Sequence, residues 1–144
     1  MQTKKRIVLG VMLPIVAGGI IYLITSPDAY VTRAVWAITR IENPFAGIEV
    51  AEQPFIVRFA RYYLCDFLWA LSLFQSIVIL LGEDHIRLAI GVGSIFCIVC
   101  EFSQLTEMIP GTFDVNDLLV ELSAGVMTLI SIVNRRIMDY EKST

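Results

Sequence analysis

Four long apolar runs constrain this chain more than any other feature of its sequence. They cover residues 7–25, 62–82, 88–105 and 115–133. Each run is close to the roughly 20 residues that a helix needs to cross the ~30 Å hydrocarbon core of a bilayer. The chain has 144 residues, 56% of them hydrophobic, and a soluble core of that size is too small to cover four such helices. We therefore predict one all-α domain, an integral membrane four-helix transmembrane bundle.

The positive charges beside these runs predict the orientation. One group lies near the two chain ends and between the second and third runs, and the other lies in the long segment 26–61. The first group is Lys4, Lys5, Arg6, Arg87, Arg135, Arg136 and Lys142, and the second is Arg33, Arg40, Arg58 and Arg61. Lys and Arg are enriched on the cytoplasmic side of membrane proteins. The larger group predicts a multi-pass protein of the cell membrane with both termini in the cytoplasm.

The segment 26–61 contains an amphipathic pattern between the first two runs. It opens with Ser26, Pro27 and Asp28, a hydroxyl cap, a first-turn proline and an acid, as is typical of a helix start. Val31, Val35, Ile38 and Ile41 then share one face, and Tyr30 and Trp36 are candidate interfacial anchors. We predict an outer interfacial helix that ends near residues 43–44, followed by an irregular candidate lid at 47–54. The alternative is a solvated helix without lipid contact.

The only charged side chains inside the four runs are acidic. They are Asp66, Glu101, Asp117 and Glu121. At 1.5 Å per residue, each lies within about 10 Å of the same predicted membrane face, although the three helices alternate in direction. Acids inside membrane spans usually face the bundle interior or a wet cavity, and they mark functional sites. This pattern predicts an outward-opening polar pocket.

Other polar residues extend the predicted pocket. Gln104 lies one turn after Glu101, and Asp114 lies one turn before Asp117. Arg58 and Arg61 precede Asp66 and are candidates for pairing with the acids or with an anionic ligand. The candidate binding residues are Asp66, Glu101, Gln104, Asp114, Asp117, Glu121, Arg58 and Arg61. Small residues at Gly91, Gly93, Ala124 and Gly125 would permit close approach of the helices.

Simpler readings of these residues remain open. Asp114 and Asp117 are also expected at the start of a helix, as a cap and as a favourable charge. Asp66 could form an ion pair with Arg58 or Arg61, and Gln104 could bridge two helices. The inner halves of the last three runs contain no Asp, Glu, Lys or Arg, which argues against a transport route.

The last three runs resemble the VanZ-like family of small membrane proteins. The resemblance covers about residues 58–133 and rests on Asp66, on Glu101-x-x-Gln104, on a turn with Pro110 and Gly111, and on Thr112-Phe113-Asp114-x-x-Asp117. Phe67, Ala70, Thr112 and Glu121 depart from the residues common in that family and indicate a divergent subgroup. The resemblance implies a link to the cell envelope and to resistance against the glycopeptide antibiotic teicoplanin.

Three functions are compatible with the predicted pocket. The leading hypothesis is a binding protein for a cell-envelope component or a lipid-linked precursor, with glycopeptide sensitivity as the phenotype. The second is an enzyme in which Asp66, Glu101 and Asp117 hold a divalent cation or divide acid and base roles. The third is an accessory subunit that docks a larger membrane protein. We expect no resident cofactor, and no nucleic acid partner, because basic patches with interleaved aromatic residues are lacking.

Overall fold

A computed structural model describes residues 5, 7–26, 29–39, 52–109 and 113–141. The secondary structure of these residues consists of helices. In chain order they are η1 (Ile7–Met12), α2 (Leu13–Thr25), α3 (Tyr30–Thr39), α4 (Phe55–Phe59), η3 (Ala60–Leu64), α5 (Cys65–Leu81), η4 (Glu83–His85), α6 (Ile86–Leu105) and α7 (Val115–Glu141). Here η1 and η3 are π-helical and η4 is a 3-10 turn. Consecutive elements join into four rods that are long and apolar enough to cross a membrane. The prediction of an all-α, four-span membrane bundle is confirmed.

Large apolar side chains cover the outside of these rods. Leu13 is 58% exposed, Ile95 is 63% exposed and Leu80 is 82% exposed. In water these surfaces would be unfavourable, but hydrocarbon solvates them as well as a protein core does. The chain is a multi-pass membrane protein.

Two rods are longer than the apolar runs predicted. The second helical rod begins at Phe55 rather than near residue 62, directly after Pro54. The last helix continues to Glu141 rather than ending near residue 133. Apolar composition sets the part of a helix that lies in hydrocarbon, whereas backbone hydrogen bonding lets the helix continue into polar sequence. The run boundaries therefore marked the membrane portion and not the helix ends.

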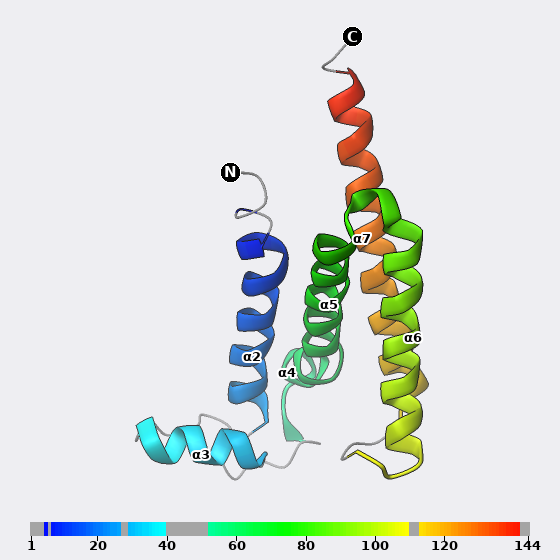
Figure 1. Ribbon diagram of the computed structural model, residues 1–144. Helices are drawn as coiled ribbons and strands as arrows, with labels where there is room; N and C mark the ends of the chain where they lie inside the picture. The colour runs from blue at the N-terminus through cyan, green and yellow to red at the C-terminus, as the bar shows by residue number, and fades with distance from the viewer. Residues whose placement is uncertain (1–4, 6, 27–28, 40–51, 110–112, 142–144) are drawn as a thin grey trace.

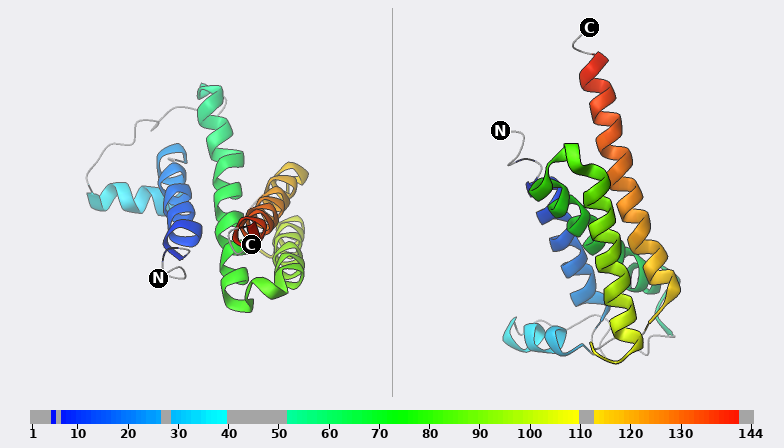
Figure 2. Two further views of the ribbon diagram at one scale, coloured as in Figure 1. Left: turned by 90° about the horizontal axis from the view of Figure 1, so that it is seen from above. Right: turned by 45° about the vertical axis from the view of Figure 1, so that its right-hand side comes forward.

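Helix α5 lies at the centre of the arrangement. It packs against α2 on one side and against α6 and α7 on the other. Figure 2 shows α5 between α2 and the α6–α7 pair when the molecule is viewed from above. The start of η1 and the last turns of α7 lie at one end of the bundle, which we call the terminal end. The end of α6, the start of α7 and the helix α3 lie at the opposite end, which we call the acidic end (Figure 1).

Phe74 of α5 joins the three central helices. Its side chain is fully buried and lies against Gly93 of α6 and Gly125 of α7. A methyl group added at Gly93 would lie 2.4 Å from the ring, and one added at Gly125 would lie 2.8 Å from it. The two glycines thus permit the close approach that their small size predicted. Gly91 plays no such part, because nothing lies within 4 Å of its added methyl group.

Side-chain donors of α5 attach η1 and α2 to this helix. The Ser72 hydroxyl donates to the carbonyl oxygen of Val11, and the Cys65 thiol donates to that of Gly18 at 3.4 Å. The Trp69 indole also packs so closely on Gly18 that an added methyl group would lie 2.8 Å from the ring. Interhelical hydrogen bonds and small residues are the usual means of association in lipid, where apolar surfaces gain nothing by leaving their solvent.

Helix α3 lies across the end of α2 instead of continuing along it (Figure 1). The Trp36 indole N–H donates to the Leu23 carbonyl at 3.1 Å and attaches the two helices. Ile38 remains 81% exposed. This orientation matches the interfacial helix of the prediction. The helix start at residues 27–28, its end at 43–44, most of the candidate lid and the turn at 110–112 lie outside the described residues.

Candidate functional site

The acidic residues of three helices meet at the acidic end of the bundle. Asp66 opens α5, Glu101 lies in the last turns of α6, and Asp117 and Glu121 lie in the first turns of α7 (Figure 1). Glu101 and Asp117 lie close enough to Asp66 for their charges to interact, and all three lie close enough to Glu121. The structure therefore brings these four carboxyl groups within electrostatic reach of one another.

Glu101 and Asp114 connect the end of α6 to the start of α7. Glu101 is only 3% exposed, and its Oε1 accepts a hydrogen bond from Gln104 Nε2 at 3.3 Å. Its Oε2 accepts from the backbone N–H of Asp114 at 3.4 Å, at the positive end of the α7 dipole. Asp114 Oδ1 in turn accepts from the Asn116 backbone N–H at 2.8 Å and from Asn116 Nδ2 at 2.9 Å. Asp114 is thus a helix cap, and Glu101 has a structural partner in the same turn.

Asp66 and Glu121 lack comparable support. No described residue forms a hydrogen bond or ion pair with the Asp66 carboxylate. Glu121 lies near the Cys97 thiol, but its Oε2 is buried without a hydrogen-bond partner in the described chain. A buried polar atom without a partner costs free energy, and this cost is larger for a charged group. These two acids, rather than Glu101 and Asp114, carry unsatisfied bonding capacity.

Each of these two acids lines its own apolar groove. The Asp66 groove has a volume of about 510 Å³ and lies between α2, α3 and α5, lined by Gly19, Tyr22, Leu23, Val35, Cys65, Asp66 and Trp69. The Glu121 groove has a volume of about 460 Å³ and is lined from α2, α5, α6 and α7, with Ile15, Leu73, Phe96, Cys97 and Cys100 beside Glu121. Trp69 borders both grooves. On each side of Trp69, an acidic side chain therefore lies next to apolar surface.

The cysteines near these grooves serve packing. Cys97 is 2% exposed and belongs to the core cluster of Ala70, Phe74 and Ala124. Cys65 is 3% exposed and donates to Gly18, as described above. All three cysteines are free thiols. Cys97 and Cys100 also line the Glu121 groove.

Arg58 and Arg61 do not pair with the acids. Arg61 Nη1 donates to the Thr25 carbonyl at 3.0 Å, and its guanidinium lies 5.7 Å from the centre of the Tyr62 ring. Arg58 Nε is buried without a hydrogen-bond partner among the described residues. The suggested ion pair of Asp66 with Arg58 or Arg61 is wrong for this structure. Arg61 instead satisfies a carbonyl at the end of α2, where helices leave such groups unpaired.

The acids also do not form a metal-binding arrangement. Within the described ranges, no group of three His, Cys, Asp or Glu side chains is placed to hold a metal ion. The geometry therefore gives the metal-dependent enzyme hypothesis no donor set. What the acidic end offers is negative charge and hydrogen-bond acceptors next to apolar grooves.

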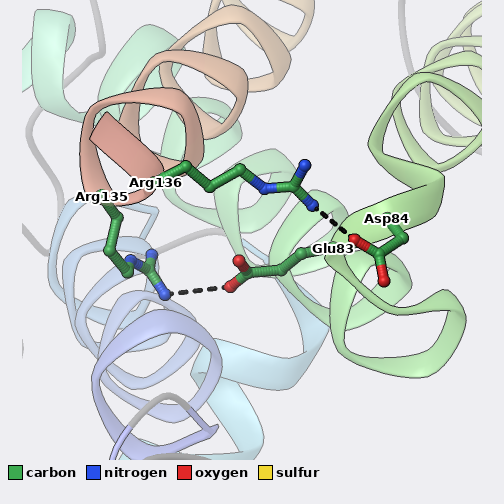
Figure 3. Close-up of polar contacts among 4 residues, drawn as sticks. All are labelled: Glu83, Asp84, Arg135 and Arg136. Carbon is green, nitrogen blue, oxygen red and sulfur yellow. Dashed lines mark hydrogen bonds and ion pairs between the residues drawn. The ribbon is translucent and has the colours of Figure 1, made fainter. Parts of the chain in front are cut away.

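The terminal end contains charged pairs that the sequence reasoning missed. Arg135 Nη1 lies 3.2 Å from Glu83 Oε1, and Arg136 Nη2 lies 3.0 Å from Asp84 Oδ1. Figure 3 shows both pairs linking α7 to the turn η4 between α5 and α6. The sequence assigned these cations only to membrane orientation. Adjacent opposite pairs, Glu83-Asp84 and Arg135-Arg136, were the available signal, but their distance along the chain concealed the contact.

Comparisons with known proteins identify no relative. No family model, no curated protein and no solved structure matches this chain.

Proposed function

We propose that this chain is a divergent VanZ-like protein of the cell membrane that binds an amphiphile of the cell envelope, such as a lipid-linked precursor. The observation that carries the proposal is the pair of apolar grooves, one lined by Asp66 and the other by Glu121. Binding sites for lipids need apolar surface for the chain and a few polar groups for the head. The two acids have unsatisfied bonding capacity at that position.

The two acids limit the chemistry of the head group. A carboxyl group accepts hydrogen bonds in either protonation state, so a matching ligand donates them through ammonium, hydroxyl or amide N–H groups. The unpartnered Arg58 Nε supplies a donor at the same end of the bundle for an anionic or carbonyl group of the ligand. Sugar and peptide parts of envelope precursors carry both kinds of group. The VanZ-like resemblance of Asp66, Glu101-x-x-Gln104 and Asp114-x-x-Asp117 supports the same class of ligand.

The proposal includes the orientation of the protein in the membrane. The acidic end faces outward and both termini lie in the cytoplasm, in agreement with the larger group of flanking Lys and Arg residues. A C-terminal reporter fusion that is active only in the cytoplasm tests this directly. Activity of a reporter that works only outside the membrane would reverse the orientation.

Lipid retention tests the binding function. The protein is purified from its own membrane in mild detergent, and the retained amphiphiles are identified by mass spectrometry. We expect Asp66→Asn and Glu121→Gln each to retain at least ~10-fold less, because a charge-assisted hydrogen bond contributes about 1.5 to 3 kcal/mol. Glu107→Gln is the matched control, since Glu107 is exposed beyond the end of α6 at the same end of the bundle.

The outcome distinguishes the competing functions. Equal retention by Asp66→Asn, Glu121→Gln and Glu107→Gln would contradict the proposal. Recovery of a second membrane protein instead of an amphiphile would favour the accessory-subunit hypothesis. In cells, a change in teicoplanin sensitivity on expression of the wild type, absent with Asp66→Asn, would support the VanZ-like assignment.

A further inference from the structure

A second polar pocket lies at the terminal end, away from the acids. It has a volume of about 470 Å³ and opens between η1, α5 and α7. Its polar and small lining residues are Lys5, Gly10, Gln75, Ser131, Arg135 and Asp139. We call it the terminal pocket. The sequence suggested no polar route in this half of the bundle because it counted only charged residues, and Gln75 and Ser131 are uncharged.

Gln75 is the most unusual residue of the terminal pocket. It is 9% exposed, and its amide has no hydrogen-bond partner among the described residues. Gly10 lies against it, so that a methyl group added there would be 3.4 Å from Gln75 Oε1. It lies six residues before the end of α5, about 9 Å along the helix. An amide at this depth in hydrocarbon is unfavourable unless a partner enters the pocket.

Charges of both signs lie nearer the mouth of the terminal pocket. Lys5 and Arg135 contribute positive charge, and Asp139 contributes negative charge one turn beyond Arg135. Arg135 uses Nη1 to contact Glu83, as Figure 3 shows. A guanidinium has five N–H donors, so this contact leaves Arg135 able to bind a second acceptor. The Ser131 hydroxyl donates to the Met127 carbonyl and keeps its lone pairs as acceptors.

We propose that the terminal pocket binds the head group of an aminophospholipid from the adjacent leaflet. The phosphate lies between Lys5 and Arg135, and the ammonium group lies against Asp139. The Gln75 amide donates to a glycerol ester oxygen, which lies deeper in the bilayer than the phosphate. The acyl chain follows Leu9, which is 52% exposed and lines the same pocket. Basic pockets between membrane helices commonly bind lipid phosphates, and the added acid selects a head group with an amine.

The proposal is independent of the function at the acidic end, because no residue lines both the terminal pocket and either acidic groove. The test is reconstitution of the purified protein in nanodiscs with equal parts of phosphatidylethanolamine, phosphatidylglycerol and phosphatidylcholine. Native mass spectrometry then measures which lipid remains bound after the nanodisc is released. We expect phosphatidylethanolamine to be enriched about 5-fold or more over phosphatidylcholine, because its ammonium group can donate hydrogen bonds to Asp139 whereas the quaternary ammonium of phosphatidylcholine cannot.

Matched variants separate binding from folding. Arg135→Gln and Arg136→Gln each remove one ion pair to η4, but only Arg135 lines the terminal pocket. Gly10→Leu fills the pocket, whereas Gly91→Leu adds the same volume where nothing lies within 4 Å. We expect Arg135→Gln, Gln75→Leu and Gly10→Leu to abolish the enrichment, and Arg136→Gln and Gly91→Leu to retain it. Asp139→Asn should lose the preference for phosphatidylethanolamine over phosphatidylglycerol while lipid binding persists.

Three results would overturn the proposal. One is no enrichment by the wild type, and another is an equal loss for Arg135→Gln and Arg136→Gln. The third concerns the source of the phosphate, since soluble phosphoethanolamine carries the same head group without acyl chains. The competition uses lipid on the order of micromolar concentration and phosphoethanolamine at about 5 to 10 times that concentration. If the phosphoethanolamine displaced the lipid completely, the ligand would be a soluble phosphate compound. Retention of the lipid under that competition supports a membrane ligand.

Discussion

The two ends of the bundle treat charge in opposite ways. At the terminal end, Arg135 and Arg136 of α7 pair with Glu83 and Asp84. At the acidic end, carboxyl groups from α5, α6 and α7 lie within electrostatic reach of one another, and Arg61 bonds to a backbone carbonyl instead of to an acid. Partly exposed ion pairs favour helix packing by up to about 1 kcal/mol, whereas acids held together in a membrane span oppose it. The acidic end is therefore the better candidate for a functional site.

The acidic end itself contains two kinds of acidic residue. Glu101 and Asp114 have hydrogen-bond partners in the α6–α7 connection, and they hold the first turn of α7 in place. Within the described chain, Asp66 has no hydrogen-bond partner, Glu121 has none at its buried Oε2, and both acids line apolar grooves. The acids that the sequence placed at one level therefore form two sets in the structure. One set positions a helix, and the other is available to a ligand.

The largest expected effect tests whether both ends depend on the same central core. Gly93→Leu should lower the free energy of unfolding by about 3 kcal/mol, because the new side chain would overlap the buried Phe74 ring. Gly91→Leu on the same helix should change it by less than ~0.5 kcal/mol. Unfolding in mixed micelles by increasing SDS measures both. Similar stability of the two variants would show that the central helices can separate without affecting the ends.

Neutralising an acid at the acidic end should stabilise the protein. At a pH high enough to ionise the acids, Glu121→Gln removes a negative charge beside Glu101, Asp66 and Asp117, and it should raise the free energy of unfolding by about 2 kcal/mol. The same SDS titration measures this in ligand-free micelles. A decrease in stability would break the comparison, since it would mean that the carboxylate makes favourable contacts at this position.

A Glu→Gln substitution at the terminal end should instead lower the stability of the protein. Glu83→Gln removes the partner of Arg135 and should lower the free energy of unfolding by about 0.5 to 1 kcal/mol, since both side chains are partly exposed. Exchanging the charges in the double variant Glu83→Arg with Arg135→Glu should recover at least half of the loss seen in either single variant. Failure of the double variant to recover stability would remove the assigned pairing.

The smallest effect is expected for the outermost pair. Asp84 is 94% exposed at its side chain and Arg136 is 47% exposed, so water screens their 3.0 Å contact. Arg136→Gln should change the free energy of unfolding by less than ~0.3 kcal/mol. A loss as large as that of Glu83→Gln would show that both pairs, and not only the inner one, hold α7 against η4.

The fold could be predicted because membrane crossing imposes a simple requirement on composition. Runs of apolar residues must be helical where no water can satisfy the backbone, so the four spans and α3 were visible in the sequence. The exact helix ends were not visible, since polar residues such as Arg135 continue a helix without belonging to the membrane portion. The common level of Asp66, Glu101, Asp117 and Glu121 also followed from simple helix geometry.

The partners of individual side chains could not be predicted in this way. An ion pair of Asp66 with Arg58 or Arg61 was one alternative from the sequence, yet a carbonyl of the distant α2 receives the hydrogen bond of Arg61. Gln75 was overlooked because an amide in an apolar run carries no charge, although in hydrocarbon its unpaired groups are costly as well.

The sequence by itself determined that the chain crosses a membrane four times and that acids gather near one face. Both results depend on composition and on distances along a single helix, which the chain sets locally. Only the tertiary structure decided which acids are bonded, which line the grooves and which end has paired charges. Those properties depend on how helices rotate and pack around Phe74, where residues far apart in sequence come into contact.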